Sequence, residues 1–262
     1  MFQPNGISLH VEDHGSGRPV VLLHRWPDSS YPWRNQIPFL VANDFRAIAP
    51  DQRGFGRSDR REGVAAYSLE NVVADVAGIL DALGIETADI VGHDWGAAVA
   101  WLTATAHPNR IHRLVVLSVG HPLAPRTLRQ REMGWFQLLF QFEGIAEASL
   151  QHDNWALFRE LLRGNGHIDR YIADLSRRDA LKASLNLVPR EPRAAPAGAA
   201  SYAAACGGSD ARYVVRKRSL PRRRTDEDVG TRREWTVALR TDRRRQPLDS
   251  VRCPRPAEPT PH

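Results

Sequence analysis

Cysteine is nearly absent from this chain, which has two in 262 residues, Cys206 and Cys253, and none before them. This scarcity excludes a disulfide framework and a cysteine-based metal site, and we expect no metal ion. Long apolar runs are missing too. There is no stretch of eighteen apolar residues, and the N-terminus lacks the charged, apolar and small-residue pattern of a signal peptide. We therefore expect a cytoplasmic protein without a membrane partner.

The charge is unevenly divided along the sequence. The whole chain carries a formal net charge of +6, but residues 1–186 hold 19 Lys and Arg against 21 Asp and Glu, whereas residues 187–262 hold 17 against 9. The second segment also contains nine of the 18 prolines and no sustained apolar period. Such a composition is typical of a disordered basic tail. Because the tail lacks interleaved aromatics and an amphipathic face, we expect no nucleic-acid partner; a genuine basic arm is the alternative.

Residues 1–186 alternate between strand-like and helix-like patterns, and from Gly120 the pattern becomes helical and aromatic. Alternation of this kind predicts an α/β fold with a mostly parallel sheet covered by helices on both faces. The helical insertion predicts a lid. The expected domains are a core at 1–120, a lid at 121–186 and the basic tail at 187–262. The predicted strands are 7–11, 20–23, 46–49, 88–91 and 114–119, and the predicted helices are 69–83, 97–107, 135–142, 155–162, 168–175 and 180–187.

Five residues, Gly92-His93-Asp94-Trp95-Gly96, place a carboxylate between a predicted strand and a predicted helix. Small flanking residues allow the strained turn of a nucleophile elbow, so Asp94 is the candidate nucleophile. A carboxylate that attacks an ester gives only an anhydride, whereas attack on a saturated carbon gives an alkyl ester that water can cleave. The pattern predicts an epoxide or alkyl halide as substrate. The alternative is that Asp94 only caps the following helix.

Two further motifs accompany this turn. Residues 24–28 read H-R-W-P-D, and residues 51–59 read D-Q-R-G-F-G-R-S-D. Together the three motifs resemble the α/β-hydrolase superfamily and, within it, the epoxide hydrolases, whose patterns are H-G-x-P and D-x-R-G-x-G-x-S. The resemblance covers residues 1–186 and implies an α/β-hydrolase core with a lid and no cofactor. It also implies that the backbone amides of Trp26 and Trp95 hold negative charge beside Asp94, while the Trp95 indole could assist a departing halide.

The pocket implied by this resemblance has two departures from the family pattern. Arg25 replaces the glycine of the H-G-x-P segment, and if that position needs a positive φ, arginine strains the loop. Residues 138–141 read L-L-F-Q and lack the lid tyrosine with which epoxide hydrolases protonate the ring oxygen; Tyr171, the only tyrosine of the predicted lid, matches no family position. The expected pocket residues are His24, which braces its loop, Pro27, Trp135 and Phe140.

The general base for ester hydrolysis is missing. Water can cleave the ester only if a base activates it and an acid orients that base. In the family both lie downstream of the lid, yet residues 187–261 contain no histidine. We interpret the tail as the product of a one-base frameshift after Asn186, so that the last core strands are absent. If the codons for residues 235–250 are read one base out of register, they can encode G-A-S-H-W, which resembles the loop of the catalytic histidine. The codons for residues 211–220, read in the same way, can encode a string that resembles the strand ending in the acid.

The sequence thus predicts an epoxide hydrolase-like hydrolase that opens an epoxide to a diol through an alkyl ester on Asp94. The chain is expected to be turnover-deficient, and a small apolar epoxide or halide is its expected partner. A haloalkane dehalogenase is the alternative enzyme, favoured by Trp95 and by Leu139 at the missing tyrosine, and opposed by Trp26, where dehalogenases often present asparagine. A non-catalytic remnant or binding protein with a lidded apolar pocket is the third interpretation. The oligomeric state stays open.

Overall fold

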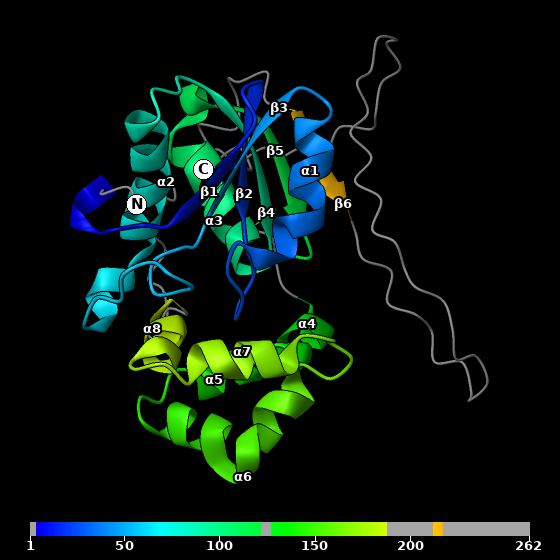
Figure 1. Ribbon diagram of the computed structural model, residues 1–262. Coiled ribbons are helices and arrows are strands. Elements are labelled where there is room, and N and C mark those ends of the chain that lie inside the picture. The colour runs from blue at the N-terminus through cyan, green and yellow to red at the C-terminus, as the bar shows by residue number, and fades with distance from the viewer. Residues whose placement is uncertain (1–3, 122–126, 188–211, 217–262) are drawn as a thin grey trace, which may run out of the picture.

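The computed structural model describes residues 4–121, 127–187 and 212–216 (Figure 1). Six strands form one sheet in the order β1-β3-β2-β4-β5-β6. β1 runs antiparallel to β3, and the other neighbouring strands are parallel. The predicted α/β fold with a mostly parallel sheet is confirmed. The strands are β1 (Val11–His14), β2 (Arg18–Leu23), β3 (Phe45–Pro50), β4 (Ala88–His93), β5 (Ile111–Leu117) and β6 (Arg212–Arg216).

Three helices, α1 (Gln36–Val41), α2 (Leu69–Ala82) and α3 (Trp95–Ala106), pack on the sheet. α2 and α3 lie on one face, and α1 lies on the other (Figure 1). Apolar residues at successive positions of β2, β3, β4 and β5 turn to opposite faces, as the pleat requires. Both faces are therefore apolar, which is typical of a parallel sheet between helices. Short 3-10 turns lie at Pro4–Gly6, Tyr31–Asn35, Val64–Tyr67 and Pro108–Arg110.

Residues 127–187 form a separate group of helices, here named the helical region, below the sheet in Figure 1. It contacts the loops that follow β2 and β3, at the carboxyl ends of the parallel strands. Ligand sites of open α/β sheets lie at that end. The helices are α4 (Leu128–Met133), α5 (Phe136–Leu139), α6 (Ile145–Leu161, kinked at residues 152–155), α7 (Ile168–Leu175) and α8 (Ala180–Asn186).

The first strand differs from its prediction. The sequence placed it at residues 7–11, but β1 runs from Val11 to His14. Ile7 and Leu9 are buried, which explains the apolar alternation. Their segment nevertheless bonds to a loop: the backbone N–H groups of Asp51 and Asp59 donate to the carbonyl groups of His10 and Ser8, both at 2.9 Å. The alternation of apolar residues at positions 7–11 therefore indicated burial, but not that this segment is a strand of the main sheet.

β6 is a second difference, because it lies in the basic tail. It pairs in parallel with β5, from Arg113 opposite Arg212 to Leu117 opposite Arg216. The sequence predicts a tail without regular structure, whereas these five residues form a strand. Without β6, the backbone groups along the outer edge of β5 would have no strand partner, and an unpaired edge accepts a short segment of β-forming sequence readily. Apart from Leu187, the other tail residues lie outside the described ranges.

Candidate active site

Asp94 occupies the turn between β4 and α3 with a strained backbone, φ 54° and ψ −117°. The turn needs its small neighbours. A Cβ atom on Gly92 would lie 2.3 Å from the Gly96 carbonyl oxygen, and one on Gly96 would lie 2.3 Å from that of Leu23. The Asp94 side chain makes no capping hydrogen bond to α3. The alternative that Asp94 serves only as a helix cap is therefore wrong.

Two backbone amides face the Asp94 carboxylate. The Trp26 N–H donates to Asp94 Oδ2 at 3.3 Å. Burial raises the pKa of Asp94, while the amides of Trp95 and Trp26 and the positive charge of Arg25 act to lower that pKa. The side chain keeps part of its surface exposed. The structure thus brings Asp94 together with the amides of Trp26 and Trp95, the three residues that the sequence singled out for the chemical step.

The Trp26 side chain is held by the helical region. Its ring centroid lies 5.0 Å from that of Phe140 and 5.8 Å from that of Phe158. Its indole N–H donates to Ser184 Oγ at 3.3 Å. Phe140 was expected in the pocket, whereas Phe158 and Ser184 were not predicted. Sequence offers no signal for them, because their roles depend on how helices more than a hundred residues away pack on the loop after β2.

His24 braces the loop that carries Trp26. Its Nδ1–H donates to the Arg25 carbonyl oxygen at 2.9 Å, and its Nε2 accepts the Gln52 N–H at 3.0 Å. Burial lowers the pKa of His24, so the ring is neutral in this arrangement. Both ring nitrogens are used, which leaves His24 unfit as a base for water. Pro27 is buried next to it. Trp135 is half exposed at the start of α5, so the structure does not bring it into the buried cluster around Trp26.

Arg25 does not strain the loop. Among the described residues with positive φ, Arg25 is absent, so its backbone has no need of glycine. The side chain instead turns to α7, where its Nη2 donates to Tyr171 Oη at 3.3 Å. The partly exposed guanidinium lies 5.7 Å from the Tyr171 ring centroid. The departure from the family pattern therefore adds a charge beside Asp94 without a backbone penalty.

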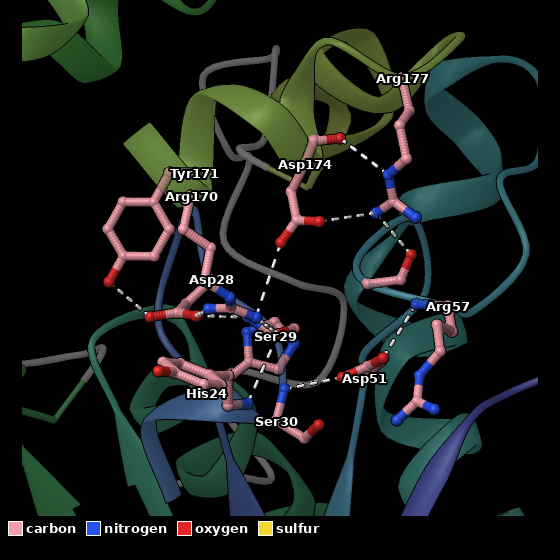
Figure 2. A network of polar contacts seen from close by, with 12 residues as sticks. His24, Asp28, Ser29, Ser30, Asp51, Arg57, Arg170, Tyr171, Asp174 and Arg177 are labelled. Carbon is pink, nitrogen blue, oxygen red and sulfur yellow. Dashed lines mark hydrogen bonds and ion pairs between the residues drawn. The ribbon is translucent and has the colours of Figure 1, made fainter. Parts of the chain in front are cut away.

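A buried polar network fastens α7 to the loop after β2 (Figure 2). Tyr171 donates its hydroxyl proton to Asp28 Oδ2 at 2.6 Å, and Arg170 Nη1 donates to Asp28 Oδ1 at 3.1 Å. Burial and the Asp28 charge raise the pKa of Tyr171, so its hydroxyl stays protonated. Asp28 lies two residues after Trp26, so this network fixes the segment that supplies the amide to Asp94.

A second connection joins the turn after α7 to the loop after β3. Arg177 Nη2 donates to the Gly56 carbonyl oxygen at 2.8 Å. In the same loop the Asp51 carboxylate accepts the N–H groups of Ser30 and Arg57 at 2.7 and 2.9 Å (Figure 2). Beyond these residues lies a groove of about 890 Å³ between α1, β1 and α7, which Asp94 does not line. The sequence predicted neither the network nor the groove, because residue spacing carries no information about contacts between α7 and the core.

Two features are absent from the described residues. These residues hold no group of three or more His, Cys, Asp or Glu side chains arranged to bind a metal ion. No helix within them combines the length and hydropathy needed to cross a membrane. The segments from which the frameshift interpretation reads the base and the acid, residues 235–250 and 211–220, fall mostly outside the described ranges.

Comparisons with known proteins point in one direction. A family model described as alpha/beta hydrolase fold matches residues 18–163, more than half of the chain. Epoxide hydrolase A of Mycobacterium tuberculosis is 41% identical over 175 residues, which cover 63% of this chain and 54% of that protein. Epoxide hydrolase 2 of Siraitia grosvenorii is 43% identical over 153 residues, covering 55% and 48%. The chain spans about half the length of these curated relatives.

A solved structure gives the same picture. The crystal structure of epoxide hydrolase VrEH1 from Vigna radiata superposes with a TM-score of 0.63 at 29% identity, and the match covers 72% of this chain and 69% of that one. Sequence and structure thus agree on the part of the molecule that contains β2, the turn at Asp94 and most of the helical region.

Proposed function

The chain belongs to the alpha/beta hydrolase fold family, and we propose that it is an epoxide hydrolase-like member with Asp94 as its nucleophile. The observation that carries this proposal is the Asp94 carboxylate at a strained turn, facing the Trp26 amide at 3.3 Å. The turn then acts as a nucleophile elbow. The names of the relatives, two epoxide hydrolases among them, support the substrate class.

In the first step Asp94 attacks a carbon of a small epoxide. A bond forms between the carboxylate oxygen and that carbon, and the ring C–O bond breaks with its electron pair passing to the ring oxygen. That oxygen takes a proton from water, since residues 138–141 offer no phenol. In the second step water, losing a proton to a base, attacks the carbonyl carbon of the ester, and the bond from that carbon to the alkyl oxygen breaks, which releases the diol and regenerates the Asp94 carboxylate. The amides of Trp26 and Trp95 are positioned to stabilise the oxyanion that forms there.

The helical region acts as the lid of this site. Phe140 and Phe158 pack on the Trp26 ring, and α7 holds the same loop through Asp28. A cover of this kind limits water around the nucleophile and strengthens its electrostatic interactions with the neighbouring amides.

Turnover is expected to stop at the ester. The His24 ring is used by its own loop, and residues 188–261 contain no histidine to serve as base. We attribute this to a frameshift after Asn186, which removed the base and its orienting acid together. Loss of a positioned general base costs about two to four orders of magnitude in the step that it serves.

A haloalkane dehalogenase is the second candidate, favoured by the indole of Trp95. The Trp26 indole N–H is already donated to Ser184, so Trp95 supplies the indole available to a leaving halide. A non-catalytic binding protein is the third candidate, which requires only the apolar pocket.

The experiment is intact-protein mass spectrometry after incubation with styrene oxide or 1-bromobutane, with Asp94→Asn as control. An adduct from styrene oxide on Asp94, with less than one equivalent of diol, supports the proposal. Bromide release with a butyl adduct supports the dehalogenase instead. An absence of adduct on Asp94 from either reagent would leave only the binding protein.

A further inference from the structure

Arg25 lies directly before the amide that binds Asp94, and its side chain is held in place by the helical region. Its Nη2 donates to the Tyr171 hydroxyl oxygen at 3.3 Å, and the guanidinium lies near the ring of the same residue. The hydroxyl proton is donated in turn to Asp28. The Arg25 side chain is therefore fixed by a neutral group, and its charge is not cancelled by that contact.

No carboxylate of the described residues forms a salt bridge with Arg25. The nearby acid Asp28 is already paired with Arg170. The Arg25 charge acts to lower the pKa of Asp94, against the larger effect of burial, which raises that pKa. The Arg25 guanidinium also keeps unused N–H groups, because it has five N–H donors and donates one hydrogen bond to the Tyr171 hydroxyl. One residue before the amide that binds Asp94 there is thus a fixed, partly exposed cation with spare donors.

An anionic substrate would normally be repelled by the ionised Asp94 carboxylate. A guanidinium beside that carboxylate offsets the repulsion and can bind a second carboxylate through two parallel N–H···O bonds. We propose that Arg25 is a specificity-determining residue that selects small epoxides carrying a carboxylate next to the ring. This inference rests on the proposed function of Asp94, because it names the substrate class of the same site.

The large groove on the other side of α7 is a weaker anion site. It is lined by four arginines, but three of them already have carboxylate partners: Arg57 with Glu12, Arg170 with Asp28, and Arg177 with Asp174. Arg57 and Glu12 approach to 2.5 Å and lie near solvent. An arriving carboxylate would have to compete with these pairs, whereas at Arg25 it displaces none.

The test compares two epoxides of the same shape, glycidate and glycidamide, which differ in the carboxylate. Their rates of adduct formation on Asp94 are measured by mass spectrometry for the unchanged protein, Arg25→Gln, Arg25→Lys and the control Arg57→Gln. Each variant's glycidate-to-glycidamide ratio cancels the intrinsic reactivity of the two rings. We expect the ratio to fall about tenfold or more in Arg25→Gln, as for a lost hydrogen bond to a charged group. Arg25→Lys should retain part of the preference for glycidate, and Arg57→Gln should leave the glycidate-to-glycidamide ratio unchanged.

A second readout does not depend on chemistry. Cyclopropanecarboxylate and cyclopropanecarboxamide have the shape of the two epoxides but cannot alkylate, and their binding is measured by NMR shifts of the Arg25 and Trp26 amides. We expect the carboxylate to bind more tightly than the amide, with Kd about tenfold higher in Arg25→Gln. Carboxylate binding that depends on Arg25, without any adduct on Asp94, would refute the proposed function and leave this inference intact. Equal effects of Arg25→Gln on both members of each pair, or a loss caused by Arg57→Gln instead, would overturn the inference.

Discussion

The two faces of the sheet are made by alternate residues of the same strands, but they are covered to different extents. Under α2 and α3, the side chains of Ile90, Leu114 and Val116 are at most 1% exposed. On the opposite face, Val91, Val115 and Leu117 keep part of their surface exposed. α1 packs there against β2 and β3 but does not bury the β4 and β5 side chains to the same degree. Among the described residues, one face is closed, and the other is closed over only half of its width.

The uncovered half has the composition of an interior surface. A valine pair, Val91 opposite Val115, continues the row of buried Leu22 on β2. Parallel sheets of this class are ordinarily covered on both faces. Apolar residues in register with a buried row therefore indicate that the fold is built for one more covering element beside α1. This agrees with the interpretation that the coding sequence after Asn186 is out of frame.

At the far edge of the same face, beside β1, the side chains are polar and suited to contact with solvent. His10, just before β1, lines up with Glu12 and His14 of β1, and the Glu12 carboxylate contacts both rings at 3.0 and 3.1 Å. Arg57 joins the same carboxylate. The polar groups of this flank bond to one another, so the flank needs no helix or strand to cover it. The face as a whole is thus not a solvent face, because only one of its two flanks is polar.

The largest expected effect comes from restoring the reading frame. Deletion of one base after the codon for Asn186 should return the missing strands, cover Val91, Val115 and Leu117, and supply the base for ester hydrolysis. Diol formation from styrene oxide should then rise by about two to four orders of magnitude, measured as steady-state turnover by chromatography. Binding of a hydrophobic dye to the open face should fall at the same time.

The control for this repair is Asp94→Asn in the repaired chain, which should form no diol although it folds. A repaired chain that binds as much dye as the original and forms no diol would show that the segment after Asn186 does not complete this fold.

Val116→Ala and Val115→Ala compare the two faces directly, since they remove the same groups from neighbouring positions of β5. We expect Val116→Ala to lower the free energy of unfolding by about 2 kcal/mol, because it leaves a cavity under α3. Val115→Ala should cost less than about 1 kcal/mol, most of it reduced β-propensity. Urea unfolding at constant m-value gives both numbers. Equal losses would mean that the β4–β5 half of the α1 face is packed as well as its opposite.

Much of this fold was predictable because its strands are buried and its turns have chemical requirements. The apolar runs located β2, β3, β4 and β5, and the glycines around Asp94 located the turn that only small neighbours permit. The pattern failed at Ile7 and Leu9, which are buried without joining the main ladder. It also gave no signal for β6, a five-residue β-forming segment that pairs with the edge of β5 inside a tail of unfavourable overall composition.

The residues at the centre of the candidate site were predictable from the sequence, but the residues that hold them in place were not. Asp94, Trp26 and Trp95 lie in short local motifs, so their approach follows from the turn and the neighbouring loop. Asp28 is visible in the same motif, but its partners Arg170 and Tyr171 come from a helix 142 and 143 positions later. Such contacts depend on tertiary packing, which no spacing rule encodes. Trp135 was expected in the pocket, yet half of its surface faces solvent.

Tyr171→Phe tests whether the contact between the core and the helical region contributes to stability as the closed face of the sheet does. The change leaves the buried Asp28 carboxylate without its 2.6 Å donor. We expect a loss of about 1 to 2 kcal/mol in the free energy of unfolding, because a buried acceptor loses a partner. Tyr31→Phe, at a partly exposed ring, is the matched control and should change little. Chemical denaturation measures both, and equal small losses would show that the Asp28 network contributes little to attachment of the helical region.

Glu12→Gln has the smallest expected effect and tests the polar flank. Hydrogen bonds from His10 and His14 are the largest of the causes that lower the pKa of Glu12 to about 2. In the unfolded chain the pKa is near 4.3, so the unfolded state binds more protons between these values. The contribution of Glu12 is therefore present above pH 4.3 and is lost as the pH falls towards 2. Because this flank is near solvent, the effect should stay below about 1 kcal/mol. Unfolding measured from pH 6 to pH 2.5 should show a steeper loss for the unchanged protein than for Glu12→Gln. Parallel curves would mean that the flank contributes no more to stability than an exposed charge.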